Sequence, residues 1–260
     1  MSDTRPVGAL PRETEAFGVP PLPFGGLRYG LRAGVLHRVL DMVPTPRRNR
    51  FALGYLVVLL GTTLFSHFAS PALVHQLQAF SSTDGHNLIH RPLLALLLSG
   101  LWVAGPVWMP YLWAFALTVA PLERRVGPWR AFGVFAAGHV LATLLSQGVV
   151  AVAVATGHLG AGALDDLDIG VSYGVLASLG ALAGLLSPRG RVLALTGAVA
   201  LIAHQILSDQ DLVTGIGHPT ALLVGIALWS RLRRGPGTPL RARLRRLVPR
   251  RSGRMAPSEA

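Results

Sequence analysis

Residues 131–156 read AFGVFAAGHVLATLLSQGVVAVAVAT, a run of 26 residues without a charged side chain. About 20 apolar residues are enough to carry a helix across roughly 30 Å of hydrocarbon. The run therefore predicts a membrane-spanning helix. Other apolar runs that reach or approach this length lie at 51–69, 171–187, 192–208 and 212–230.

A longer apolar stretch, 92–122, is interrupted by Gly105-Pro106 and by Pro110. Its 31 residues correspond to roughly 46 Å of helix at 1.5 Å per residue. That length is too great for one crossing and too small for two crossings joined by a turn. Two interpretations follow: one span after a half-buried interfacial segment, or a hairpin of two short spans.

The distribution of charge decides between these interpretations. With one span in this stretch, 23 of the 24 basic residues, all of them arginines, fall on one side of the membrane. A seventh span would move Arg124, Arg125 and Arg130 to the other side. Positive residues accumulate on the cytoplasmic side of membrane proteins. The sequence therefore predicts an all-α polytopic bundle of six transmembrane helices, with both termini cytoplasmic, in the plasma membrane.

The same pattern divides the chain into three parts. Residues 1–50 are expected to be a cytoplasmic tail with a short amphipathic helix at 35–43 lying on the membrane surface. Residues 51–230 form the membrane domain, and residues 231–260 an Arg-rich cytoplasmic tail. We expect the tails to orient the chain and to contact anionic lipid head groups. We expect no nucleic acid partner.

The composition excludes several kinds of chemistry. The chain has no cysteine, which excludes disulfides, thiol nucleophiles and Cys-ligated metals. The predicted spans carry no relay of carboxylates, which disfavours an ion-coupled transporter. His86 and His90 are spaced for a metal on a helix but have no third ligand at a clear spacing. We therefore expect no metal and no cofactor, and a neutral nucleophile becomes the leading possibility. We expect His139, His204 and Gln205 to form hydrogen bonds between helices.

Ser172 is the strongest candidate nucleophile. It lies where an acidic loop enters the fourth predicted span, with Gly170 two residues before it and Gly174 two residues after it. The glycines let backbone and neighbouring helices approach closely. A serine at a helix N-terminus also has free backbone N–H groups nearby, which suit a developing oxyanion.

His218, at the start of the sixth predicted span, is the candidate base. Ala221 and Gly225 follow it at i+3 and i+7 and form a stripe of small residues on its face. Ala177 and Gly180 form a comparable stripe after Ser172 in the fourth span. Helices carrying such stripes can pack closely. We expect the two stripes to bring Ser172 and His218 together near the external side.

With these residues, the chain resembles the rhomboid superfamily of intramembrane serine proteases, most closely a divergent bacterial branch. The resemblance covers about residues 51–230. Leu122-Glu-Arg-Arg-Val-Gly127 is similar to the acidic-Arg-Gly turn of the family, Gly170-Val-Ser172 with Gly174 to its G-x-S-G motif, and His218 with its small residues to the catalytic histidine helix. The resemblance implies Ser172 as nucleophile, His218 as general base, and transmembrane proteins as substrates.

The sequence also departs from the family. Tyr173 replaces the glycine that normally follows the serine, and Pro219 directly follows the proposed base. The H-x-x-x-N pair that helps to bind the oxyanion is missing from the second span, where residues 107–112 read VWMPYL. Oxyanion support is then expected from the backbone near Gly170 and Gly174, or from the hydroxyls of Tyr111 or Tyr173. The alternative is a catalytically inactive rhomboid-like protein that binds transmembrane segments. A small-solute transporter ranks third.

Overall fold

The computed structural model describes residues 44–103, 108–209 and 211–233, which all fall in one unit. The predicted tail at 1–34, the interfacial helix at 35–43 and most of the Arg-rich segment lie outside the described residues. The structure therefore addresses the predicted membrane domain.

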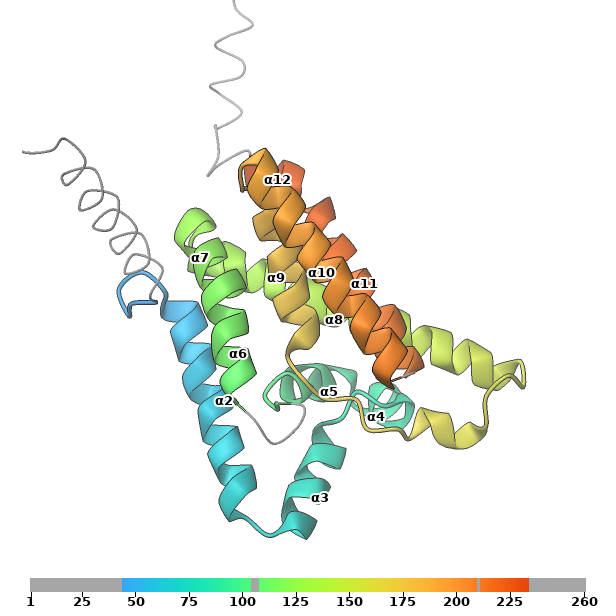
Figure 1. Cartoon of the computed structure of the whole chain (residues 1–260). Helices are drawn as coiled ribbons and strands as arrows, with labels where there is room; N and C mark the ends of the chain where they lie inside the picture. The colour runs from blue at the N-terminus through green and yellow to red at the C-terminus, as the bar shows by residue number, and fades with distance from the viewer. Residues whose placement is uncertain (1–43, 104–107, 210, 234–260) are drawn as a thin grey trace, which may run out of the picture. The chain divides into compact units, whose positions relative to one another are not determined.

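The described part of the chain is helical and contains no strand (Figure 1). Its elements are α2 (Arg50–Phe68), α3 (Pro71–Ser81), α4 (Gly85–His90), α5 (Pro92–Ser99), α6 (Met109–Ala114), the π-helical turn η1 (Phe115–Val119), α7 (Ala120–Val126), α8 (Pro128–Ala155), the 3₁₀ turn η2 (Ala161–Leu164), α9 (Ser172–Ala183), α10 (Pro188–Asp209), α11 (Leu212–Ala227) and α12 (Trp229–Arg233).

Four helical segments are long and apolar enough to cross a membrane: Arg50–Phe68, Pro128–Ala155, Pro188–Ser208 and Leu212–Arg233. They coincide with four of the predicted spans. The fourth predicted span is shorter than expected, because α9 ends at Ala183. The apolar stretch 92–122 contains α5 and then a helical run, α6–η1–α7, from residue 109 to 126. The protein is thus a helical membrane protein, and the count of six spans stays a prediction.

Helix α9 is the central helix of the fold. Ten of its twelve residues are buried, and α8, α10 and α11 all pack against it. A Cβ added to Gly225 of α11 would collide with the carbonyl oxygen of Ala177, and one added to Gly180 would collide with that of Leu222. The small residues thus bring the backbones of α9 and α11 into direct contact.

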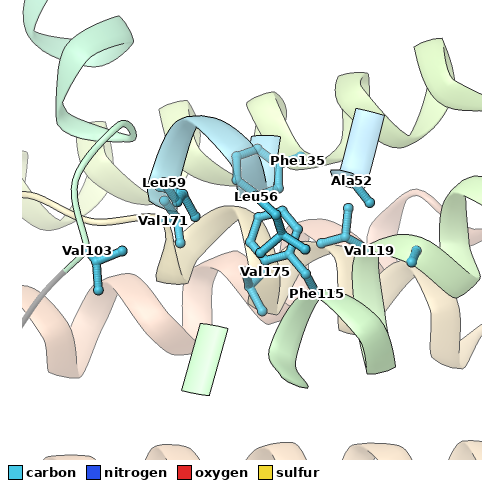
Figure 2. Close-up of a cluster of buried hydrophobic side chains, with 10 residues drawn as sticks. Ala52, Leu56, Leu59, Val103, Phe115, Val119, Phe135, Val171 and Val175 are labelled. Carbon is cyan, nitrogen blue, oxygen red and sulfur yellow. The ribbon is translucent and has the colours of Figure 1, made fainter. Parts of the chain in front are cut away.

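A buried apolar cluster joins α9 to the N-terminal half of the domain (Figure 2). Phe115 of η1 lies at its centre and is fully buried. The other labelled side chains come from α2, η1, α8, α9, the residue before α9 and the segment after α5: Ala52, Leu56, Leu59, Val103, Val119, Phe135, Val171 and Val175. The cluster holds the start of α9 against α2 and η1.

At one end of the domain, Glu123 of α7 joins α7 to α2. Its carboxylate is buried and accepts hydrogen bonds from the backbone N–H groups of Phe51 and Ala52, each at 2.9 Å. A negative charge is favourable at a helix N-terminus, where N–H groups have no partner within the helix. Gly127 then turns the chain into α8 with a φ of 85°, a conformation that favours glycine.

Arginines gather at the C-terminal end of α9. The guanidinium groups of Arg191 and Arg233 donate to the carbonyl oxygen of Gly184 at 3.5 and 3.1 Å, and both lie beside the ring of Trp229. Cations are favourable at a helix C-terminus. The opposite, N-terminal end of α9 lies beside α5 (Figure 1). There the backbone N–H of Gly170 donates to the carbonyl oxygen of Ser99 at 3.0 Å.

Candidate active site

Ser172 is the first residue of α9. The twelve residues of this helix correspond to roughly 18 Å, which is well short of roughly 30 Å of hydrocarbon. Because arginines mark the other end of α9, and positive residues gather at the cytoplasmic membrane surface, we expect Ser172 to lie within the depth of the bilayer. The loop that precedes it has irregular backbone, which is tolerated at that depth only where protein or a water-filled cavity surrounds it.

The hydroxyl oxygen of Ser172 lies 2.9 Å from Nε2 of His218, a buried residue in the second turn of α11. This is the distance expected between a nucleophile and its general base. The approach depends on the contact between α9 and α11, to which Ala177, Gly180 and Gly225 contribute as described above, and Ala221 is fully buried nearby. The structure therefore brings together the two side chains that the sequence analysis paired.

Tyr173 positions His218. Its ring packs edge-on against the imidazole, with 5.4 Å between the ring centroids and an angle of 80°. Its hydroxyl donates to the carbonyl oxygen of Val213 at 3.2 Å, and Gly217 leaves the space that the ring fills. The hydroxyl that we considered as an oxyanion donor is therefore engaged with α11.

Gly170 and Gly174, the other predicted oxyanion supports, have different surroundings. Gly170 has a φ of 136°, and its N–H donates to Ser99. A Cβ added to Gly174 would collide with the ring of Phe135, so this glycine serves helix packing. The first helical hydrogen bond of α9 runs from the N–H of Val175 to the carbonyl of Val171 at 3.1 Å. Helix geometry leaves the N–H groups before it without an intrahelical acceptor, and these remain as backbone donors beside Ser172.

Asp168 fixes the loop that leads to Ser172. Its Oδ2 accepts hydrogen bonds from the Thr83 hydroxyl and from Nε2 of Gln147, each at 2.9 Å. Its backbone N–H donates to the Ser82 hydroxyl at 3.0 Å. Burial raises the pKa of this carboxyl group, and the two hydrogen bonds oppose that rise. Asp168 thus joins α8 and the segment between α3 and α4 to the loop of the nucleophile, contacts that the sequence did not indicate.

Two hollows meet at the Ser172–His218 pair. The first, which we call the polar cavity, has a volume of about 170 Å³ and is lined mainly by polar side chains, including Thr143 and Asp168. The second, which we call the apolar groove, has a volume of about 630 Å³ and runs between α6–η1 and α10 over α9. Four residues line both hollows: Tyr111, Ser172, Gln205 and His218.

A second serine–histidine contact lies deeper in the protein. Ser99 Oγ is 3.2 Å from Nε2 of His139, but the same nitrogen is 3.1 Å from the carbonyl oxygen of Leu96. A carbonyl only accepts, so Nε2 carries the proton and cannot take one from Ser99. Ser99 is also fully buried. This pair ties α5 to α8, in agreement with the hydrogen-bonding role expected of His139.

His204 and Gln205 of α10, expected to bond between helices, have other surroundings. His204 is exposed, and its Nδ1 contacts Ser208 in the same helix. Gln205 lines both hollows. The only signal for Gln205 in the sequence is an uncharged polar residue within an apolar run, which does not distinguish a packing residue from a site residue.

Comparison with known proteins adds a family match. The family described as "rhomboid-like protein" matches residues 47–238, a range that contains both Ser172 and His218. No curated protein and no solved structure matches the chain.

Proposed function

Because the match covers most of its length, the chain belongs to the rhomboid-like protein family, and we propose that it is an intramembrane serine endopeptidase that cleaves transmembrane proteins. The observation that carries the proposal is the 2.9 Å separation of Ser172 Oγ and His218 Nε2. Neither residue needs a cofactor for acyl transfer.

The proposed reaction begins with the proton of Ser172. His218 Nε2 takes this proton while Ser172 Oγ attacks a peptide carbonyl carbon, which gives a tetrahedral intermediate with a negatively charged oxygen. When the C–N bond breaks, His218 returns the proton to the leaving amine and an acyl-enzyme remains. His218 then takes a proton from a water molecule, which attacks the ester carbonyl carbon. When the C–O bond to Ser172 breaks, His218 returns this proton to Ser172 Oγ and the second product leaves.

The apolar groove supports a membrane-embedded substrate. Its walls carry mainly aliphatic side chains, among them Leu117, Leu176 and Leu193, and Ser172 and His218 also line it. An apolar segment in the groove would therefore lie beside the nucleophile. The polar cavity on the other side offers hydrogen-bonding groups to water, which hydrolysis requires.

We propose in addition that the protein lies in the plasma membrane with both termini in the cytoplasm. The arginines at the C-terminal end of α9, Arg191 and Arg233, support this orientation. We expect the Arg-rich tails to contact anionic lipid head groups.

An inactive protein that binds transmembrane segments is the second candidate. It is favoured by the absence of the family's histidine and asparagine from residues 107–112, which read VWMPYL. Losing one oxyanion donor typically slows a reaction by about 10²- to 10³-fold. On this alternative, the apolar groove holds a segment that is never cut.

Labelling with a fluorophosphonate probe separates the two candidates. Purified wild-type protein in detergent and in lipid should be labelled, and Ser172→Ala and His218→Ala should not. Ser99→Ala is the matched control, because it removes the serine of the second contact and should leave labelling intact. If folded wild-type protein is not labelled, or if Ser172→Ala is still labelled, the protease assignment is wrong.

A further inference from the structure

Gln205 is an unsatisfied polar group in an apolar helix. Its Oε1 is buried without a hydrogen-bond partner, and no hydrogen bond joins its carboxamide to any residue that the structure describes. Its helix, α10, is a candidate span. Burying a carboxamide without hydrogen bonds is unfavourable. A half-turn of the carboxamide exchanges the positions of Oε1 and Nε2, so the side chain can present its two N–H donors to a group that enters the site.

The position of Gln205 indicates which partner this is. Among the described residues, only Tyr111, Ser172 and His218 share with Gln205 the property of lining both the polar cavity and the apolar groove. Two of these are the proposed nucleophile and base. Gln205 approaches them from α10, on the side of the groove opposite α6 and η1. A peptide in the groove would therefore lie between Gln205 and the helical run that lacks the family's usual donors.

The chemistry of the reaction indicates what Gln205 binds. When Ser172 attacks, negative charge develops on the former carbonyl oxygen, and that oxygen needs hydrogen-bond donors. A glutamine carboxamide supplies two N–H donors on one nitrogen. Two of the predicted candidates are engaged elsewhere, since the N–H of Gly170 donates to Ser99 and the hydroxyl of Tyr173 donates to Val213.

We propose that Gln205 is an oxyanion-binding residue, whose Nε2 donates to the tetrahedral intermediate together with the first backbone N–H groups of α9. On this view, a donor on the fifth predicted span replaces the donors that the second span lacks. The inference rests on the proposed protease function. It adds a catalytic residue that the family resemblance does not imply.

Two substitutions test the proposal. Gln205→Leu removes the carboxamide with little change in size, and Gln205→Met keeps the length of the side chain but has no N–H donor. His204→Leu is the matched control, because His204 is the neighbouring residue on α10 and is exposed. For each protein, the rate constant of fluorophosphonate labelling is measured, together with kcat and KM for a transmembrane reporter. Thermal unfolding in the same detergent reports whether each variant is folded.

Both Gln205 variants should lower the labelling rate and kcat by about 10²-fold. KM should stay unchanged, because an interaction made only in the transition state affects kcat alone. A purely structural role would instead lower the unfolding temperature or raise KM. Should either folded Gln205 variant be labelled at the wild-type rate, the proposal is overturned.

The outcome also separates this inference from the proposed function. If wild-type protein is not labelled at all, both proposals fail together. If wild-type protein is labelled, Ser172→Ala is not, and the Gln205 variants match the wild type, then Ser172 remains the nucleophile and only the role of Gln205 is rejected.

Discussion

The ring of Tyr173 fills the space in front of Gly217, where any Cβ would collide with the ring atoms. The same ring packs edge-on against His218, one residue further along α11. The residue that replaces a family glycine after the nucleophile is thus accommodated by a second glycine beside the base. The position of the imidazole depends on both.

Gly217→Ala should therefore disturb the site. The added methyl group forces Tyr173 to move, and overpacking of this kind costs about 1–3 kcal/mol. We expect lower stability and slower fluorophosphonate labelling, because His218 loses the ring that holds it. Gly215→Ala is the control on the same helix, since its nearest contact would be an ordinary 3.8 Å from Ile206. Equal labelling of the two variants would contradict a positioning role for Tyr173.

Gly225→Ala should separate α9 from α11. Its Cβ would meet the backbone oxygen of Ala177, which cannot rotate away as a side chain can. We expect a loss of stability of about 1–3 kcal/mol and slower labelling. Gly148→Ala on α8, where nothing lies within 4 Å of the added carbon, should have neither effect. Thermal unfolding in detergent measures the difference, and unchanged stability of the Gly225 variant would argue against the close contact.

Because the pKa of Asp168 is raised in the folded protein, we expect the stability of the protein to depend on pH. Burial raises the pKa of this carboxyl group in the folded protein above its unfolded value, so the folded state binds the proton more tightly. The contribution of Asp168 to the free energy of unfolding is fully present below the pKa of the group in the unfolded chain, about 3.9. This contribution is lost as the pH rises through the pKa in the folded protein.

Asp168→Asn removes this effect, because the amide oxygen can still accept from Thr83 and Gln147 but carries no charge. The stability of the variant should fall less than that of the wild type between about pH 4 and neutral pH. Asp165→Asn, which removes an exposed charge from the same loop, controls for net charge. Parallel pH profiles for wild type and Asp168→Asn would refute the prediction.

The predicted orientation can be tested with fused reporters. A reporter placed after Arg234 should report a cytoplasmic position, because 23 of 24 arginines fall in segments assigned to that side. A reporter inserted in the loop 157–169 should report an external position. An external C-terminus would mean that the number of spans is not six.

Much of the fold and of the nucleophile–base pair was predictable from the sequence. Apolar runs identify helices that cross a membrane, because the length and composition of a span are local properties. Four of the predicted spans correspond to helices long enough to cross, and the family match confirms the rhomboid-like family. Ser172 and His218 could be paired because glycine and alanine at helical spacing indicate where two helices can approach.

The rest of the site was decided by tertiary structure. Tyr173 looked like an oxyanion donor, yet its hydroxyl donates to Val213, a residue 40 positions away in the chain. Gln205 was expected to form a hydrogen bond between helices, yet it lines both hollows beside Ser172. A sequence indicates which side chains can donate or accept a hydrogen bond. Which distant group each one meets depends on how the helices cross, and therefore only the folded chain determines it.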